Sequence, residues 1–284
     1  MMAEIYFDYL KMMTEINAYM NKYSFLSVNG ICQSILGQTV PALVIGEGER
    51  TVIYVGGEVG NDLISPNLLL RFTKDICSLY EEGGSAFGFS AENILKNYTL
   101  VIIPMLNPDG SSYCKNGIAS DNPLKERVLK MNGGSDNFSA WCKNARGVDL
   151  RYNYGAEYSS VEPEIEVGAL CNFLRYGMKP DILMVFSQSE NADGALYFGD
   201  GEIENKMAIA LSQMSGMRRE YRESQEKKLM LADWAIRELD SAAFSLEIPQ
   251  ENYNSRKQFE DKAFSFYAKI RKLFFCAPFL NKIK

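Results

Sequence analysis

The sequence of 284 residues contains no histidine. This absence excludes a Ser-His-Asp or Cys-His nucleophile, an imidazole proton shuttle and any metal site that depends on histidine ligands. The six cysteines are scattered and form no C-x-x-C pair, so the chain has neither a zinc ribbon nor a dithiol redox motif. We expect these cysteines to be mostly buried free thiols in a reducing compartment.

Basic charge and long apolar runs are also scarce. Lys and Arg total 30 against 36 for Asp and Glu, a formal net charge of −6 that disfavours a nucleic-acid partner. No apolar run approaches the roughly 18 residues of a membrane span. The N-terminus, MMAEIYFDYLKMM, lacks the basic start and the uninterrupted apolar stretch of a signal peptide. The sequence therefore predicts a cytoplasmic protein without a membrane partner, and it does not indicate an oligomeric state.

What the chain does contain is an alternation of strand-like and helix-like segments, which is typical of α/β layering. Apolar runs predict strands at 40–46, 51–57, 98–105, 181–187, 195–199 and 242–248. Apolar periodicity predicts helices at 4–22, from Ser65-Pro66 to Gly83-Gly84, at about 161–176, 203–215 and 228–239, and along a last stripe from Phe259 to Ala277. We interpret residues 1–284 as one domain, a three-layer α/β/α sandwich with a mixed central sheet.

Two stretches between these segments lack periodicity. Asn107-Pro108-Asp109-Gly110 predicts a turn at the end of the strand at 98–105. Residues 111–158 are rich in Gly, Asn and Ser and predict a long loop region, which in a domain of this size is usually functional or disordered.

Six segments in order resemble the zinc carboxypeptidase superfamily, whose fold is that of carboxypeptidase A. They are IYVGGEVGNDLISPNLLLRF (53–72), PMLNPDG (104–110), LKMNGGSDNFSAWCKNARGVDLRYNY (129–154), VEPEIEVGALCNFL (161–174), MVFSQSENADGALYF (184–198) and DWAIRELDSAAFSLEI (233–248). The resemblance is strongest to the bacterial γ-D-glutamyl–diaminopimelate endopeptidases, which trim peptidoglycan stem peptides. It implies a metallopeptidase fold over nearly the whole chain.

The resemblance also implies which residues should bind zinc, and these have changed. The family's His and Glu of GG-x-H-G-N-E correspond to Val59 and Asp62, and its third ligand, a His, corresponds to Phe186. A catalytic zinc needs three protein ligands and an open position for water, so we expect no zinc cofactor here. The alternative is a hard cation such as Mg²⁺, Ca²⁺ or Mn²⁺ held by carboxylates alone. Its ligands would be Glu58, Asp62, Glu190 and Glu247.

Glu247 occupies the position of the family's catalytic glutamate, which takes a proton from zinc-bound water. Without zinc this carboxylate would face water with a pKa of about 15.7, and we expect it to be inactive. A buried carboxylate must be paired or protonated, and we expect Arg151 to be its partner. Asp149 corresponds to the family's aspartate that orients a ligand histidine.

The implied substrate site has changed as well. The family's Asn-Arg pair after GVDL, which holds a substrate carboxylate, is here Arg151-Tyr152. A guanidinium clamp depends on its placement, so a shift of one residue should alter this contact. A further basic residue of the pocket follows the Trp of the long loop, and here that position is Cys142, with Lys143 next to it. Arg151, Tyr152 and Lys143 are the candidate substrate-binding residues.

Three hypotheses follow. The first is a non-catalytic homologue that retains a groove for peptides, either cell-wall-type peptides and peptidoglycan fragments or a protein partner. The alternative is an active peptidase on γ-D-glutamyl–diaminopimelate peptides with a remodelled site. That site would hold a carboxylate-bound metal or use Glu247 with Asp62 or Asp149 as acid and base. The third is a regulatory partner of an active homologue.

Overall fold

The computed structural model of the chain describes residues 7–155, 162–189, 195–199, 202–223, 229–249, 253 and 255–283. Its strands are β1 (Leu26–Gln33), β2 (Thr39–Ile45), β3 (Arg50–Val55), β4 (Ser85–Ala86), β5 (Phe89–Ser90), β6 (Tyr98–Ile103), β7 (Ile182–Ser189), β8 (Ala195–Phe198), β9 (Arg218–Tyr221) and β10 (Ala242–Pro249). All except β4 and β5 join one eight-stranded sheet in the order β1-β2-β6-β3-β7-β10-β8-β9.

The strand directions make this sheet mixed, as the sequence predicts. The four central strands β6, β3, β7 and β10 run parallel to one another. The pairs β1–β2, β2–β6 and β10–β8 are antiparallel, and β8–β9 is parallel. Continuous apolar sequence explains the central strands, because parallel strands of an α/β sheet are covered on both faces.

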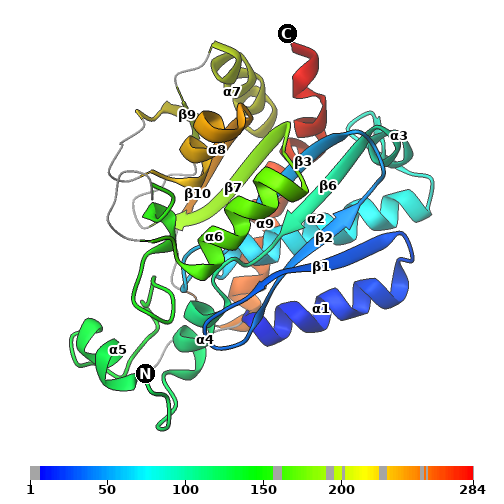
Figure 1. The fold of residues 1–284 in the computed structure, drawn as a ribbon. Helices are drawn as coiled ribbons and strands as arrows, with labels where there is room; N and C mark the ends of the chain where they lie inside the picture. The colour runs from blue at the N-terminus through cyan, green and yellow to red at the C-terminus, as the bar shows by residue number, and fades with distance from the viewer. Residues whose placement is uncertain are drawn as a thin grey trace.

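Helices cover both faces of the sheet (Figure 1). The α-helices are α1 (Tyr9–Lys22), α2 (Ile64–Glu81), α3 (Ala91–Asn97), α4 (Pro108–Asn116), α5 (Lys125–Met131), α6 (Ile165–Asn172), α7 (Glu202–Ser215), α8 (Leu231–Leu239) and α9 (Arg256–Cys276). Shorter turns are the 3-10 helices η1 (Leu150–Tyr152) and η4 (Ala277–Ile283) and the π-helix η2 (Phe173–Gly177). No helix in the described part of the chain is long and apolar enough to cross a membrane.

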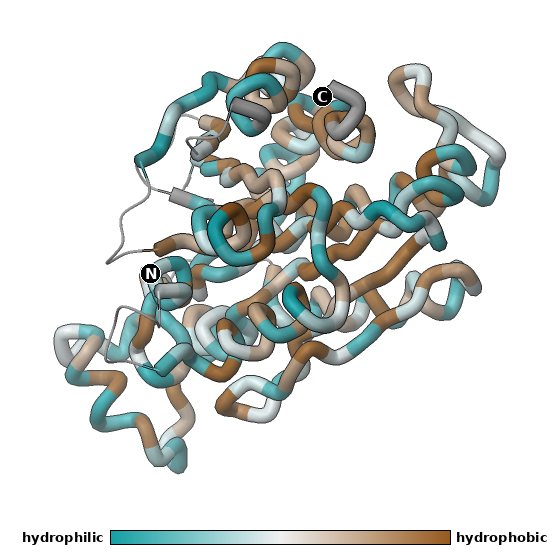
Figure 2. The backbone as a smooth tube through the Cα atoms, turned by 45° about the horizontal axis from the view of Figure 1, so that its top comes forward, coloured by the Kyte–Doolittle hydropathy of each residue, from teal (hydrophilic) through white to brown (hydrophobic). Residues whose placement is uncertain are grey.

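Two hydrophobic cores separate the three layers, and the strands between them are brown in Figure 2. Alternate residues of each strand enter alternate cores. On β7, Phe186 joins the core beneath α1, α2, α7 and α9, whereas Val185 joins the core beneath α6 and α8. A third, small core lies in the lobe of α4 and α5, around Trp141 and Phe138.

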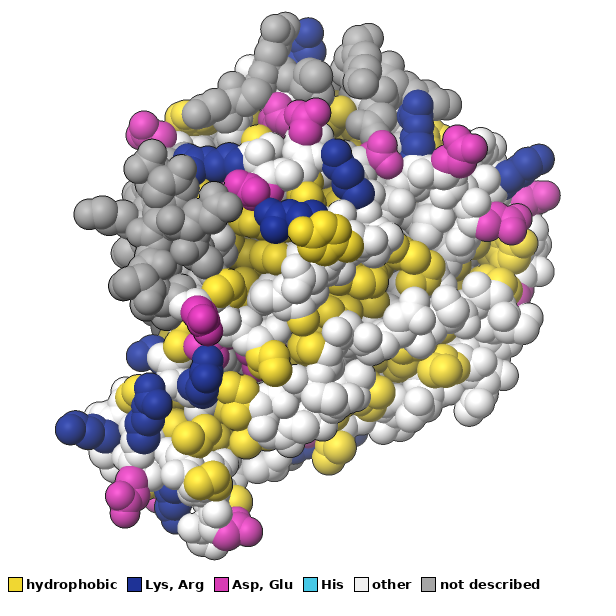
Figure 3. Space-filling model, viewed as in Figure 1, with side chains coloured by type: hydrophobic (Ala, Val, Ile, Leu, Met, Phe, Trp, Pro, Cys, Tyr) yellow, Lys and Arg dark blue, Asp and Glu magenta, His cyan; other side chains and the backbone are white. Residues whose placement is uncertain are grey.

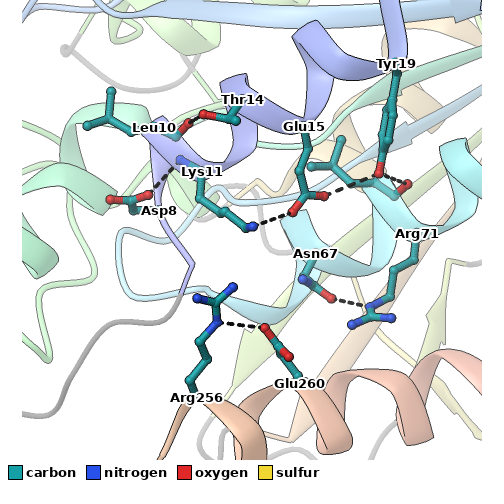
Figure 4. Close-up of polar contacts among 11 residues, drawn as sticks. Asp8, Leu10, Lys11, Thr14, Glu15, Tyr19, Asn67, Arg71, Arg256 and Glu260 are labelled. Atoms are coloured by element: carbon teal, nitrogen blue, oxygen red, sulfur yellow. Dashed lines mark hydrogen bonds and ion pairs between the residues drawn. The ribbon is translucent and has the colours of Figure 1, made fainter. Parts of the chain in front are cut away.

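Figure 4 shows polar contacts along α1, one of which joins this helix to α2. The Asp8 carboxylate accepts a hydrogen bond of 2.8 Å from the Lys11 N–H and so caps the first turn. The Tyr19 hydroxyl lies 3.3 Å from the Glu15 carboxylate and 3.4 Å from the Leu70 carbonyl of α2. The predicted helix at 4–22 thus begins at Tyr9, and residues 1–6 lie outside the described residues.

Several predictions need correction. Asn107-Pro108-Asp109-Gly110 begins α4 rather than forming a turn, because the Asn107 side chain accepts the Gly110 N–H at 2.9 Å and Pro108 occupies the first turn. The predicted loop region at 111–158 includes α5 and η1 besides the rest of α4, and residues 156–158 are not described. The sequence also predicted neither β1 nor β9.

The start of α2 differs from its prediction too. The sequence predicts a helix that begins at Ser65-Pro66, but α2 begins at Ile64. The capping group is the Asp62 carboxylate, which accepts the Ser65 N–H at 2.9 Å. An aspartate three residues before the donor N–H satisfies a group that the helix itself cannot satisfy. Asp62, one of the expected metal ligands, therefore stabilises the first turn of α2.

Candidate functional site

The site expected from the sequence lies beyond the carboxyl ends of the parallel strands, where open α/β sheets usually bind ligands. After β3 the chain enters the loop that contains Glu58, Val59 and Asp62. The Leu106 and Asn107 N–H groups, just after β6, donate to the Gly56 and Gly57 carbonyls at 3.1 and 2.8 Å and fix this loop. Gly57 has φ +63°, and a Cβ there would lie 2.8 Å from the Met105 Cα, so this close approach requires glycine.

Two of the three expected metal-ligand positions carry only hydrocarbon, and both are buried. Val59 is 4% exposed. Phe186 is fully buried and stacks on Phe274 of α9, with ring centroids 5.1 Å apart and planes 6° from parallel. Phe186 therefore belongs to the core beneath α2 and α9, and neither side chain can donate an electron pair to a metal.

The third position, Asp62, is buried and its carboxylate is already engaged. One oxygen accepts the Ser65 N–H at 2.9 Å and the other accepts the Gln188 N–H of β7 at 3.2 Å. The Gln188 side chain in turn accepts the Leu63 N–H at 3.2 Å. Asp62 thus joins the start of α2 to the end of β7. Burial raises its pKa to about 6, while these hydrogen bonds lower it.

These donors do not fit zinc. Among the described residues, no group of three or more His, Cys, Asp or Glu side chains is arranged to hold a metal ion. Glu190, which the carboxylate-only alternative requires, lies outside the described residues. We therefore derive no reaction step through a metal.

Glu58 also belongs to this site, although the sequence indicated it only as a ligand of a carboxylate-bound cation. It is 1% exposed and accepts a hydrogen bond of 2.7 Å from the Tyr154 hydroxyl. The pKa of Glu58 is raised to about 7, chiefly by burial and also by the charges of Asp149 and Asp62, while the Tyr154 hydrogen bond and the Arg151 charge lower it. An acid between glycines directly after an apolar strand was the signal for this buried carboxylate.

Glu247 is paired, but not with the residue we expected. Its carboxylate forms an ion pair with the guanidinium of Arg222, which follows β9. The same guanidinium lies 3.9 Å from the centre of the Tyr197 ring and donates a hydrogen bond of 2.8 Å to the Met230 sulfur. The hypothesis of an Arg151–Glu247 pair is therefore wrong, because both residues have other partners.

Arg151 binds Asp149 instead. Its guanidinium donates two hydrogen bonds to the two carboxylate oxygens, at 3.0 and 2.6 Å, and this pairing raises the pKa of Arg151. Asp149 thus neutralises the guanidinium that was the candidate clamp for a substrate carboxylate. Tyr152 lies beneath Arg151, with 5.3 Å from the guanidinium carbon to the ring centre, and is 42% exposed.

Two polar groups near these strand ends could form a polar contact with a ligand. The Lys143 amine lies 5.9 Å from the centre of the Trp141 ring, and no described carboxylate pairs with it. The Ser187 hydroxyl is buried and has no hydrogen-bond partner within the described ranges. Ser187 stands beside Glu247 in the β7–β10 register, so both side chains face the side of the sheet opposite Phe186.

Comparison with known proteins agrees with this architecture. Residues 12–180 match the family profile described as zinc carboxypeptidase. A metallo-carboxypeptidase from Burkholderia cenocepacia superposes with a TM-score of 0.69 at 15% identity, over 96% of this chain and 71% of that one. Thrombin activatable fibrinolysis inhibitor superposes with the same TM-score at 17% identity, over 97% of this chain and 73% of that one.

Fold and site together define a carboxypeptidase-like α/β protein in which the positions expected to bind metal carry Val59, Asp62 and Phe186. The chain belongs to the zinc carboxypeptidase family. Gamma-D-glutamyl-L-diamino acid endopeptidase 1 of Lysinibacillus sphaericus is 31% identical over 152 residues, which cover 54% of this chain and 38% of that protein. The matched region therefore spans well under half of this relative's length.

Proposed function

We propose that this protein is a non-catalytic member of the family that binds short peptides beyond the carboxyl ends of its parallel strands. The observation that carries this proposal is the new use of the metal-ligand positions. Val59 and Phe186 fill core volume, and both oxygens of Asp62 accept backbone N–H groups. Each of these roles supports the fold, and among the described residues no group of carboxylates or thiols is arranged to hold a hydrolytic metal.

The pairing of Glu247 supports the same proposal. A zinc-bound water has a pKa of about 7, whereas free water has one of about 15.7, so a carboxylate alone has little driving force to deprotonate it. Glu247 is in addition bound to the Arg222 guanidinium, which occupies an oxygen that a base would use. No hydrolytic step can be derived from this arrangement.

The proposed ligand is a peptide with a γ-D-glutamyl–diamino acid linkage, the class in the name of the Lysinibacillus sphaericus relative. Such peptides carry several carboxylates. The Lys143 amine, which pairs with no described carboxylate, and the Ser187 hydroxyl, which has no described hydrogen-bond partner, offer a cation and a hydrogen-bond donor for them. We propose that Lys143 contacts a ligand carboxylate and that Ser187 contributes at the buried end.

The experiment is a calorimetric titration with L-Ala-γ-D-Glu-meso-diaminopimelate, followed by chromatography of the same mixture with and without added zinc. We expect saturable binding, intact peptide under both conditions, and binding about tenfold weaker in Lys143→Ala. Lys130→Ala, which removes an exposed amine from α5, is the matched control and should bind normally. Zinc-dependent cleavage would contradict the non-catalytic assignment, and absence of binding would contradict the proposed ligand.

A second candidate function is favoured by the acids around Asp62. Burial raises the pKa of Glu58 to about 7 and that of Asp62 to about 6, values at which one carboxyl can act as acid while another acts as base. An enzyme of this kind would cleave the peptide without added metal. Peptide cleavage that disappears in Glu58→Gln would support it, and intact peptide at every pH tested would reject it.

A reducing, cytoplasmic location remains part of the proposal. All six cysteines are free thiols in the structure, which is what a reducing compartment maintains. Fractionation of the native host, with detection of the protein in the cytosolic fraction, tests this location.

A further inference from the structure

A cavity of about 470 Å³ lies between α6 and α8, on the face of the sheet opposite α2 and α9. Its wall includes Tyr154, Val167, Gly168, Arg175, Trp234 and Arg237. In the view of Figure 3 the surface over α6 and α8 shows hydrophobic side chains bordered by basic and acidic ones. Tyr154 is the only one of these six residues that also contributes to the site described above, through its hydroxyl contact with Glu58.

The cavity combines an aromatic wall with two guanidinium groups. The Arg175 guanidinium lies 5.4 Å from the centre of the Trp234 ring and is 2.9 Å from the Glu238 carboxylate. Arg237 is exposed, and no carboxylate of the described residues forms an ion pair with it. The two arginines and Glu238 leave one positive charge in excess, so the cavity favours an anion.

The backbone of α6 is adapted to this cavity at two points. The helix continues as the π-helix Phe173–Gly177, which carries Arg175 and closes with a hydrogen bond of 2.8 Å from the Met178 N–H to the Phe173 carbonyl. Such turns are rare and are found frequently at functional sites.

Gly168 is the second point. It lies inside α6, where glycine lowers helix stability relative to alanine. A Cβ at this position would meet only the Pro163 Cβ, at 3.9 Å, so no close approach requires glycine there. The missing side chain instead leaves space in the cavity.

We propose that this cavity binds a small aromatic carboxylate. Its ring would pack on the Trp234 indole and its carboxylate would receive hydrogen bonds from Arg237 and Arg175, since guanidinium groups match carboxylates in a two-bond geometry. The volume lies within the range of about 300–1,000 Å³ that is usual for small-molecule sites. This inference does not depend on the proposed peptide ligand, which would lie beyond the strand ends.

The test is calorimetric titration of the full chain with 2-naphthoate and, separately, with the neutral 2-naphthamide. We expect one saturable site for 2-naphthoate and binding about tenfold or more weaker for the amide, because only the carboxylate makes charge-assisted hydrogen bonds. Arg237→Ala should weaken 2-naphthoate binding by about the same factor. Arg127→Ala, an exposed arginine on α5, should leave it unchanged.

A variant that fills the cavity checks the location of the site. Gly168→Leu places a side chain in the cavity and should abolish 2-naphthoate binding while the far-UV circular dichroism remains unchanged, since leucine favours helix over glycine. Absence of saturable binding to the unmodified chain, equal affinity for the amide, or full binding in Gly168→Leu would each overturn the proposal.

Discussion

The guanidinium of Arg222 forms an ion pair with the carboxylate of Glu247, the residue that the family resemblance places at the catalytic-base position. The two side chains are 22% and 17% exposed, so the pair is largely withdrawn from solvent. The Tyr197 ring lies against the guanidinium at 3.9 Å. This pairing holds the Glu247 carboxylate against a cation inside the fold.

Removal of Arg222 should therefore destabilise the protein. In Arg222→Ala the Glu247 carboxylate loses its partner while it stays largely buried, and we expect a loss of about 1–3 kcal/mol in the free energy of unfolding. Chemical denaturation measures this loss. Arg219→Ala, on the same strand but exposed, is the control and should change the stability by less than about 0.5 kcal/mol.

A double-mutant cycle separates the pair from other effects of the substitution. If Arg222 acts through Glu247, Arg222→Ala should lower the free energy of unfolding much less in the background of Glu247→Gln than in the native chain. An equal cost in both backgrounds would show that the ion pair contributes nothing and that the contacts of Arg222 with Tyr197 and Met230 account for the loss.

Glu166 on α6 is a buried carboxylate whose oxygens have no hydrogen-bond partner among the described groups. Its pKa is raised from 4.5 to about 7, chiefly by burial and in smaller part by the charges of Asp109 and Glu164. A carboxyl with a raised pKa contributes most to stability below its unfolded value. That contribution is lost as the pH rises through the folded value.

Glu166→Gln should therefore gain stability relative to the native chain as the pH increases, by about 2–3 kcal/mol between about pH 5 and about pH 8. Denaturation curves at several pH values measure this difference. Glu162→Gln, an exposed residue of the same segment, should show no such trend. Parallel pH profiles for Glu166→Gln and the native chain would mean that Glu166 is not held in its neutral form.

Much of the fold could be predicted because it depends on local patterns. The central strands β3, β6, β7 and β10 are continuous apolar runs, and their predicted bounds are within about two residues of the structure. Strand β9, Arg-Arg-Glu-Tyr, is polar and mostly exposed, and it forms a strand only because β8 pairs with it. Local sequence could not show this.

The site was predicted less well for a related reason. The resemblance indicated which residues should stand at the ligand and base positions, but it could not indicate the partners of those residues. Arg222 reaches Glu247 only through the pairing of β8 with β9 and with β10, which bring together residues separated by 25 positions. Arg151 was expected to reach Glu247, yet Asp149, two positions away in the chain, is a nearer partner.

Asp62 is expected to behave as a helix cap rather than as a vacant metal ligand. Asp62→Ala leaves the buried Ser65 and Gln188 N–H groups without acceptors and should cost about 2 kcal/mol or more in unfolding free energy. Asn61→Ala, at the adjacent half-buried position, is the control. A stable Asp62→Ala variant would contradict the structural role, and a thermal shift with Mg²⁺ or Mn²⁺ that vanished in this variant would favour the carboxylate-bound metal.

Restoring a histidine at position 186 should not restore a metal site. Phe186→His places a polar ring between Tyr54 and Phe274 in the core, where no described group is placed to bind it. This substitution should lower the free energy of unfolding by about 3 kcal/mol. Phe186→Leu keeps the position apolar, and its loss of unfolding free energy should be roughly half as large or less. A Phe186→His variant as stable as the native chain, or one stabilised by zinc, would contradict the placement of this side chain.

The central claim is that the zinc carboxypeptidase fold here no longer holds zinc. Elemental analysis of untagged protein, after dialysis against zinc and then against buffer without metal, tests this claim most directly. We predict that far less than one zinc per chain remains and that a chelator leaves the melting temperature unchanged. One tightly bound zinc per chain, whose removal lowers the melting temperature, would contradict the account.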